Sequence, residues 1–342
     1  MTDIHLRKSE HIQYSLSEAS LSKKINGFDQ YEFNHRALPE LNFSEIDIRT
    51  DFFQQSLSTP FLVSSMTGGV ELAGKINQRL AEAAEAQRWI LSLGSTRIML
   101  DSEQHRESFQ LRAVAPTVPI IANIGAVQLN YGVTVADIRN IIEWTDANAL
   151  VFHLNSIQEV IQTGGDTDFS QLLDKMEQVI KQLDIPVGVK EVGFGIDGET
   201  AEQLHDIGMS FIDVAGAGGT SWSQVEKLRS NDAIKKEAAE AFADWGIATT
   251  ACLEQIREKK LSNKIIASGG IRNGHDAAKA IALGANHVGY AREVLKPAME
   301  STEAVVKWME TRELELKMVM FGVGSRTMED LMETNRLIKR KG

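Results

Sequence analysis

The sequence lacks three features that would assign it to particular classes of protein. It contains a single cysteine, Cys252, among 342 residues, which excludes an intramolecular disulfide and any zinc site built from several cysteines. No apolar run approaches the roughly 18 residues of a membrane span. The polar start, Met1 to His11, has no apolar core of a secretory signal. These absences predict a protein of a reducing compartment, which we expect to be cytoplasmic and to have no membrane partner.

An excess of positive charge is also missing. The formal net charge of −11 argues against a nucleic-acid partner, because binding to a phosphate backbone needs clustered basic residues. An acidic protein that binds anions must therefore gather its positive charge locally. The candidates, most of which stand beside glycine or at the end of an apolar run, are Arg7, Lys8, Arg97, Lys190, Arg272 and Arg292.

Eight short apolar runs are present, and segments with helical periodicity separate most of them. The runs are Pro60 to Met66, Ile90 to Gly94, Ile120 to Ile124, Ala149 to Leu154, Pro186 to Val192, Phe211 to Ala215, Lys264 to Ala267 and His287 to Tyr290. Strand and helix repeated eight times predict an α/β protein of the TIM (β/α)8 barrel class. A doubly wound open sheet is the alternative, but no Gly-x-Gly-x-x-Gly turn follows the first run.

The barrel leaves room for additions at both ends. We expect residues 1–59 to form an N-terminal extension, residues 60–297 to form the barrel, and residues 298–342 to form one or two helices that pack on the barrel or in an oligomer interface. A charged, helix-prone insertion at residues 221–245 is interpreted as an expanded loop over the active face.

Two consecutive strand ends are rich in glycine and arginine. The run that ends at Ala267 is followed by Ser268-Gly269-Gly270-Ile271-Arg272, and the run that ends at Tyr290 is followed by Ala291-Arg292. Glycines let backbone N–H groups approach an anion, and barrels bind phosphate at this position. The sequence therefore predicts a phosphorylated cofactor.

The other strand ends are polar as well, and catalytic groups of barrels lie at the carboxyl ends of strands. At the end of the fourth run, His153 and Asn155 share one face of the chain, and Gln158 and Glu159 begin the next turn. Such groups can donate to an anionic oxygen or hold a divalent cation. We expect Lys190 to point into the barrel mouth, because a buried amine on the outer face would be costly.

These motifs resemble those of the type 2 isopentenyl diphosphate isomerases, a family of FMN-dependent barrels, over nearly the whole chain. The most specific is His153-Leu154-Asn155 with Gln158-Glu159. It is supported by Arg7-Lys8 with Glu10-His11, Met66-Thr67-Gly68-Gly69, Ser95-Thr96-Arg97, Lys190-Glu191-Val192-Gly193, Gly218-Gly219-Thr220-Ser221-Trp222 and the two glycine and arginine turns.

The resemblance implies a role for each matching position. FMN would be bound by Met66, Thr67, Gly68, Ser95, Asn123, Lys190 and Thr220, with its phosphate at Gly270, Ile271, Arg272, Ala291 and Arg292. The substrate diphosphate would be bound by Arg7, Lys8, Ser95, Thr96, Arg97, His153 and Asn155. Glu159 would coordinate Mg2+ on that diphosphate, and Gln158 would lie near the isoprene carbons. The linker from Gln162 to Asp166 receives no role.

The implied reaction interconverts isopentenyl diphosphate and dimethylallyl diphosphate by proton addition and removal. Reduced FMN would stabilise a cation-like state without net oxidation, after reduction by NAD(P)H. The resemblance also implies a homotetramer, and the helix expected at Glu313 to Met320 has an apolar face that could serve as its interface. We expect the arm Arg7 to His11 to be mobile until the diphosphate binds.

Two other enzymes share parts of this pattern. A 2-hydroxy-acid oxidase has the same barrel and phosphate turns but needs a histidine base near the seventh strand, where this chain offers only His275 at a helix start. A nucleotide-oxidising barrel needs a cysteine after the sixth strand, and Gly218 to Trp222 contains none. A noncatalytic binding module would not need so many convergent polar groups.

Overall fold

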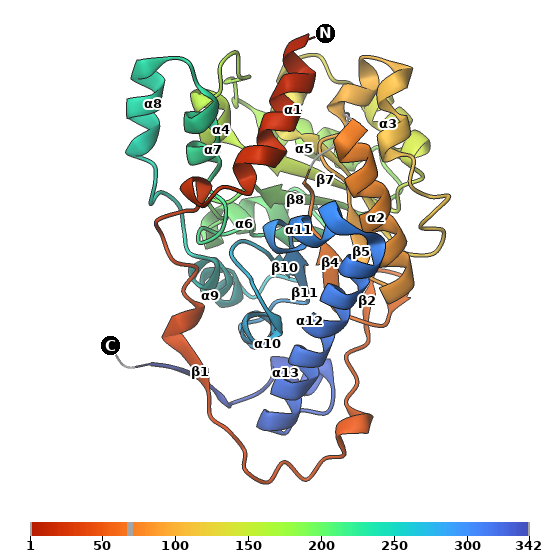
Figure 1. Cartoon of the computed structure of the whole chain (residues 1–342), viewed down its shortest axis with the longest axis vertical. Helices are drawn as coiled ribbons and strands as arrows, with labels where there is room; N and C mark the ends of the chain where they lie inside the picture. The colour runs from red at the N-terminus through yellow and green to blue at the C-terminus, as the bar shows by residue number, and fades with distance from the viewer. Residues whose placement is uncertain (1, 67–70, 341–342) are drawn as a thin grey trace.

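The fold is known from a computed structural model, which describes residues 2–66 and 71–340. Within these residues, eight parallel strands close into a barrel with the order β4-β5-β6-β7-β8-β9-β10-β11 (Figure 1). The strands are β4 (Phe61–Val63), β5 (Ile90–Ser92), β6 (Ile120–Gly125), β7 (Ala149–Leu154), β8 (Val187–Glu191), β9 (Phe211–Asp213), β10 (Lys264–Ala267) and β11 (His287–Tyr290). Each coincides with one of the eight apolar runs, although β6 extends one residue beyond its run, and the predicted TIM barrel is confirmed.

Helices follow most of the strands and cover the outside of the barrel (Figure 1), but only the short turns η4 (Arg97–Leu100), η5 (Glu103–His105) and η6 (Glu107–Phe109) lie between β5 and β6. The helices of the barrel are α2 (Glu71–Gln87), α3 (Val135–Thr145), α4 (Ser156–Ile161), α5 (Leu172–Ile180), α6 (Gly198–Asp206), α9 (Thr249–Lys259), α10 (Gly274–Ala282) and α11 (Arg292–Glu300). Several begin at a side-chain cap: Thr134 and Asp137 form a capping box at α3, and Asn273 accepts a hydrogen bond from the backbone N–H of Asp276 at α10.

Some strands are shorter than the apolar runs that predict them. The run from Phe211 to Ala215 leaves the sheet after Asp213, and Ala215 has a φ of 38°. A non-glycine residue with positive φ cannot continue a strand. The chain therefore turns toward the barrel mouth while the sequence is still apolar.

The insertion after β9 forms two helices, α7 (Trp222–Arg229) and α8 (Ala233–Glu240). They lie at the same end of the molecule as the N-terminal helix α1 (Thr2–Ser15), and α1 contacts α7 (Figure 1). The residues expected as a polar arm, Arg7 to His11, are part of α1. The predicted expanded loop is thus a helical cover on one side of the mouth.

The terminal segments contain more structure than the sequence indicates. Short helical turns, η1 (Glu18–Ser20), η2 (Phe28–Gln30) and η3 (Phe43–Glu45), and the hairpin β2 (Thr50–Phe52) with β3 (Gln55–Leu57) precede the barrel. After it come α12 (Thr302–Val323), α13 (Met328–Met332) and β12 (Leu337–Lys339), which pairs antiparallel with β1 (Tyr31–Phe33). The expected boundary between residues 297 and 298 falls inside α11.

The barrel interior holds its own apolar core. Leu62, Ile90, Ile121, Val151 and Ile266 point inward from five strands. The β2–β3 hairpin adds Phe52, whose ring meets that of Phe211 edge to face at 5.6 Å between centroids. Gly188 makes room for Phe211, because a Cβ at Gly188 would lie 2.4 Å from that ring. The hairpin therefore closes the amino end of the barrel, and the carboxyl end remains open. Along the described chain, no helix is both long and apolar enough to cross a bilayer.

Candidate active site

The carboxyl end of the barrel contains a cavity of about 1280 Å3. This exceeds the roughly 300–1,000 Å3 of a typical small-molecule site, so the cavity has room for more than one ligand. The ends of all eight barrel strands and helices α1, α4 and α7 contribute to its lining. The predicted site residues that line it are Arg7, Lys8, Met66, Ser95, Arg97, Asn123, His153, Asn155, Gln158, Glu159, Lys190, Thr220, Gly270, Ile271, Arg272, Ala291 and Arg292.

Three of the predicted site residues are not among those that line the cavity. Thr96 is buried, and its hydroxyl donates a hydrogen bond to the backbone oxygen of Asn123 at 2.7 Å. It joins the ends of β5 and β6 instead of facing the cavity. Thr67 and Gly68 lie outside the described residues.

Strand register aligns a row of functional residues around the mouth. Gly125 on β6 is paired with His153 on β7, His153 with Lys190 on β8, and Lys190 with Asp213 on β9. Side chains on directly paired residues of neighbouring strands point to the same face of a sheet. The alternation of the backbone therefore carries the histidine, the lysine and the aspartate to one level of the cavity.

His153 is held in one tautomer by its neighbours. Asn123 donates through Nδ2 to the backbone oxygen of Leu93 at 3.1 Å, so its Oδ1 is left as an acceptor for Nδ1–H of His153 at 2.9 Å. Burial, with a smaller effect from the charge of Lys190, lowers the pKa of His153 to about 3. The imidazole is therefore neutral at ordinary pH, and its Nε2 carries a lone pair. To donate from Nε2 to an anion, it must take up a proton when that anion binds.

Lys190 lies inside the cavity, as the sequence predicts. Its side chain is buried, and its ammonium group donates to the backbone oxygen of Glu191 at 2.5 Å. The charge of Lys190 acts on two nearby carboxylates, Glu191 and Asp213. Asp213 also accepts a hydrogen bond from the Ser268 hydroxyl at 2.5 Å. Burial raises the pKa of Asp213, and the charge of Lys190 opposes that rise. Lys190 can therefore present a positive charge to an electron-rich ring in the mouth.

The residues after β7 surround one carboxylate. Glu159 accepts hydrogen bonds from Asn155 Nδ2 at 2.8 Å, from the backbone N–H of Asp166 at 2.8 Å and from Gln162 Nε2 at 3.2 Å. Burial raises its pKa, which these hydrogen bonds partly oppose. The Oδ1 of Asn155 is buried and has no hydrogen-bond partner among the described residues. Of the four residues expected to act together, Asn155, Gln158 and Glu159 form one hydrogen-bonded cluster, whereas His153 bonds to Asn123 instead.

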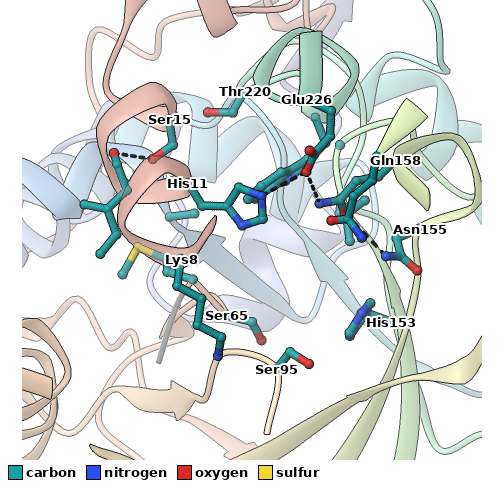
Figure 2. Close-up of a pocket in the computed structure, with 18 of the residues that line it drawn as sticks. Lys8, His11, Ser15, Ser65, Ser95, His153, Asn155, Gln158, Thr220 and Glu226 are labelled. Atoms are coloured by element: carbon teal, nitrogen blue, oxygen red, sulfur yellow. Dashed lines mark hydrogen bonds and ion pairs between the residues drawn. The ribbon is translucent and has the colours of Figure 1, made fainter. Parts of the chain in front are cut away.

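Helix α1 carries side chains over this cluster. Figure 2 shows Lys8 and His11 pointing from α1 into the cavity, with Gln158 and Glu226 opposite His11. Glu226 accepts hydrogen bonds from His11 Nε2 at 2.9 Å and from Gln158 Nε2 at 3.1 Å. Arg229 donates to the same carboxylate at 2.5 Å. Burial alone would raise the pKa of Glu226, but the hydrogen bond from His11 and the charge of Arg229 hold it below its ordinary value. Burial also lowers the pKa of His11, so Arg229 is the permanent positive charge beside this carboxylate.

Sequence reasoning missed Glu226 and gave His11 no role. Glu226 is almost fully buried although it lies on an inserted helix with charged neighbours. Nothing in the local sequence distinguishes it from an exposed helical glutamate. The contact forms only when α1 and α7, which are separated by the barrel strands in the sequence, meet above the mouth.

The glycine-rich turns lie at the other side of the cavity. Gly269 has a φ of 98°, and a Cβ at this position would lie 2.1 Å from the backbone oxygen of Gly216. Arg272 and Arg292 both line the cavity. The guanidinium of Arg292 in addition donates to the backbone oxygens of Leu16 at 2.9 Å and Ser17 at 3.1 Å. Arg292 thus connects the phosphate side of the mouth to the segment that follows α1.

Several groups in the cavity suit a flavin and a cation. The Ser64 hydroxyl at the end of β4 is buried, lines the cavity and has no hydrogen-bond partner among the described residues, which fits a polar ligand above it. No cluster of three or more His, Cys, Asp or Glu side chains in the described part of the chain could hold a metal. Mg2+ is commonly bound by one or two carboxylates and substrate phosphates, so the single carboxylate of Glu159 fits a cation that arrives with a diphosphate.

Comparison with known proteins decides the family. A sequence model of the FMN-dependent dehydrogenase family matches residues 126–339. An isopentenyl-diphosphate delta-isomerase of Oceanobacillus iheyensis is 55% identical over 335 residues, which make up 98% of this chain and 96% of the relative. Relatives with the same name from Synechococcus sp. and Rickettsia canadensis are 46% and 43% identical, over 92% and 95% of this chain and 91% and 95% of their own length. The chain belongs to the isopentenyl-diphosphate delta-isomerase family. The resemblance inferred from the motifs is thereby confirmed.

Solved structures show that this isomerase family shares its barrel with oxidising flavoenzymes. A flavocytochrome b2 mutant with pyruvate bound matches with a TM-score of 0.71 at 19% identity, over 96% of this chain and 82% of that chain. A mandelate oxidase mutant with benzaldehyde matches with a TM-score of 0.68 at 18% identity, over 98% and 95%. This likeness establishes the fold alone. His275, the histidine considered for the oxidase alternative, is exposed, stacks on Phe33 outside the cavity and does not line it.

Proposed function

We propose that this protein interconverts isopentenyl diphosphate and dimethylallyl diphosphate on reduced FMN, with no net oxidation. The observation that carries the proposal is a large cavity lined by Lys190, His153 and Glu159, in a chain that is 55% identical to an isomerase of that name. Lys190 supplies positive charge for a flavin, and Glu159 supplies a carboxylate for a magnesium ion on a diphosphate. One cavity therefore suits both ligands.

For FMN, the residues at the ends of β4, β5, β6, β8 and β11 and the glycine-rich turns form the binding set. Reduced FMN, when bound, supplies an electron-rich ring that can stabilise positive charge and exchange a proton. Lys190 contributes a fixed positive charge, and the backbone of Gly270 to Arg272 contributes N–H donors for the phosphate. Ser64 adds a buried hydroxyl that was not predicted from the sequence.

The diphosphate would occupy the side of the cavity under α1. Arg7, Lys8 and Arg97 bring positive charge to it, and His153 takes up a proton to donate from Nε2. Glu159 would bind Mg2+ together with phosphate oxygens, with the unpartnered Oδ1 of Asn155 beside it. Desolvation of these charges strengthens their attraction to the diphosphate.

Gln158 would lie near the carbons that exchange protons. An amide is a poor base at neutral pH, so its contribution is to orient the alkene and to connect it to a carboxylate. Its Nε2 donates to Glu226, which fixes the direction of the amide group. Closure of α1 over this part of the cavity would exclude water from a cation-like state.

The remaining features of the proposal concern the protein in the cell. NAD(P)H would reduce the flavin before the first turnover, and the enzyme would work in the cytoplasm as a homotetramer. Residues 1–59 would supply the substrate-binding arm, residues 60–297 the FMN barrel, and residues 298–342 the packing or interface helices.

The deciding experiment is an anaerobic assay of the purified protein with reduced FMN, Mg2+ and isopentenyl diphosphate. We expect dimethylallyl diphosphate to appear without consumption of NADPH beyond the amount that reduces the flavin. Stoichiometric NADPH consumption without isomer would overturn the proposal and favour an FMN-dependent oxidoreductase.

A further inference from the structure

The loop that follows α4 packs directly on the Glu159 carboxylate, although no role was expected for this linker. It runs from Gln162 to Asp166 and turns through Gly164, which has a φ of 68°. A Cβ on Gly165 would lie 2.0 Å from the backbone oxygen of Glu159 and 2.8 Å from its Oε2. The two glycines therefore allow the loop to fold back closely enough for the backbone N–H of Asp166 to donate a hydrogen bond to Oε2 of Glu159 at 2.8 Å.

A second segment holds this loop in place. The turn η7 (Ala126–Asn130) follows β6, and Gln128 on it is buried and lines the cavity. Its Nε2 donates to Oδ2 of Asp166 at 2.8 Å, while its Oε1 is buried without a hydrogen-bond partner among the described residues. The amide therefore donates to Asp166, and its acceptor oxygen is unused among the described residues.

The neighbours of Gln128 hold the continuation of the same loop. Asn130 Nδ2 donates to the backbone oxygens of Asp168 and Ser170 at 2.8 and 2.9 Å. The Tyr131 hydroxyl accepts from the backbone N–H groups of Thr167 and Asp168 at 3.0 and 3.1 Å. Only Gln128 among these three contacts the residue that bonds to Glu159, so its effect on the carboxylate can be separated from general anchoring of the loop.

We propose that Gln128 and Asp166 are positioning residues for Glu159, and through it for the magnesium ion that accompanies the substrate diphosphate. This inference rests on the proposed role of Glu159. Mg2+ requires near-ideal octahedral geometry with ligands at about 2.0–2.1 Å, so a carboxylate that turns freely binds it poorly. Hydrogen bonds to a metal ligand fix its orientation, and their loss weakens metal affinity about 10–100-fold.

The test measures magnesium-dependent binding of inorganic pyrophosphate to the FMN-loaded protein without turnover. Calorimetry gives the dissociation constant of pyrophosphate with and without Mg2+, and the ratio of the two reports the magnesium contribution. We expect Gln128→Leu and Asp166→Ala each to reduce that ratio about tenfold or more. FMN content should remain that of the unmodified protein, because the change acts on the cation side of the cavity.

Two variants separate positioning from other effects. Asp166→Asn keeps the backbone N–H and an oxygen that accepts from Gln128, so we expect it to retain most of the magnesium contribution. Asn130→Ala removes two hydrogen bonds from the same loop without touching Asp166 and should leave the ratio nearly unchanged. In turnover assays, Gln128→Leu should raise the Mg2+ concentration for half-maximal rate while kcat at saturating Mg2+ is largely kept.

The outcomes distinguish this inference from the function on which it rests. Glu159→Gln serves as the reference for a site that has lost its metal ligand. If Glu159→Gln abolishes the magnesium contribution but Gln128→Leu and Asp166→Ala do not change it, or if Asn130→Ala reduces it as strongly, the positioning role is wrong. If the unmodified protein shows no magnesium contribution at all, both the metal role of Glu159 and the inference are wrong.

Discussion

The two ends of the barrel differ in how they are closed and in what their buried polar groups face. At the amino end, Phe52 from the hairpin packs against Phe211 and closes the barrel with an apolar core. At the carboxyl end, Ser64, Gln128 and Asn155 keep buried polar atoms without partners among the described residues. Such atoms cost free energy in the folded state unless a ligand satisfies them. Buried polar atoms without described partners also occur at the amino end, at Gln55, Thr59 and His287. Those of the carboxyl end differ because they belong to residues that line the cavity. The comparison indicates that, in the part of the chain that the structure describes, only the carboxyl end has such atoms where a ligand can bind.

The largest expected effect is at the amino end. Phe52→Ala should lower the free energy of unfolding by about 3–5 kcal/mol, because it opens a cavity beside Phe211. The FMN content of the protein that remains folded should not change. Urea unfolding and flavin absorbance measure the two quantities, with the exposed Leu38→Ala as a control for stability. A large loss of FMN affinity at unchanged stability would contradict the division between the two ends.

The stability of the folded protein should fall in acid because of buried histidines at both ends of the barrel, and a ligand should reduce this loss at the carboxyl end only. Burial, with a smaller effect from the charge of Lys264, lowers the pKa of His287 from 6.5 to about 4. Below pH 6.5 the unfolded chain binds a proton that the folded protein refuses, so stability falls as the pH falls toward 4. One such group contributes a slope of up to about 1.4 kcal/mol per pH unit.

His287→Leu should remove that slope, which is measured by urea unfolding of the apoprotein at about pH 7.5 and pH 5.5. His153 at the carboxyl end also has a lowered pKa, of about 3, so it too makes the folded protein less stable as the pH falls. Pyrophosphate should therefore reduce the part of the acid loss that belongs to His153 and leave the part from His287. Parallel pH curves for the variant and the unmodified apoprotein would refute the assignment to His287.

A smaller change at the carboxyl end should have effects of opposite sign on stability and binding. Ser64→Ala removes a buried hydroxyl without a partner, so the apoprotein should become about 1 kcal/mol more stable. FMN affinity should fall about 3–10-fold, which corresponds to the loss of one hydrogen bond. Thr96→Val is the matched control, because that hydroxyl is already bonded to Asn123. The control should lose stability instead, and a Ser64→Ala apoprotein that also loses stability would argue against the comparison.

The smallest expected effect concerns Lys8. Burial, followed by the charge of Arg7, lowers the pKa of Lys8 to about 7, so above pH 7 its amine is largely neutral before an anion binds. Diphosphate favours the charged form, and binding should take up as much as one proton above pH 7. The affinity for pyrophosphate should therefore fall as the pH rises beyond 7.

Lys8→Met should raise KM for the substrate and flatten this pH dependence, with FMN content unchanged. Calorimetry in buffers of different ionisation enthalpy measures the proton uptake, and the exposed Lys236→Met is the control. Loss of the yellow cofactor in Lys8→Met would place α1 on the wrong side of the cavity.

The sequence was most informative where a local pattern determines the structure. Each barrel strand carries an apolar run, most of which end at a polar residue or glycine, and strand register then brings His153 and Lys190 to one level. The strands β1 and β12 were not predicted, because each has three residues and the partner of Tyr31 is Lys339, at the far end of the chain. Short segments of this kind are strands only because they pair.

The same limit applies to the cavity. Residues at strand ends could be assigned from the fold, since a barrel places them in its mouth. The contacts of Glu226 with His11 and of Gln128 with Asp166 join segments that are separate in the sequence. The local sequence around these residues does not predict such contacts. Thr96 illustrates the converse, because a motif position can turn away from the cavity to bond the backbone of a neighbouring strand.

The pairing of β1 with β12 matters to anyone who handles this protein. These strands lie on the flank of the molecule, away from α1 (Figure 1), and Lys339 donates to Glu254 on α9 at 2.9 Å. A purification tag or fluorophore attached after β12 would project from a surface remote from the cavity, so it should not affect catalysis. A tag joined ahead of α1 would instead extend the helix that carries Lys8 and His11, so the carboxyl-terminal fusion is the safer choice for assays and immobilisation.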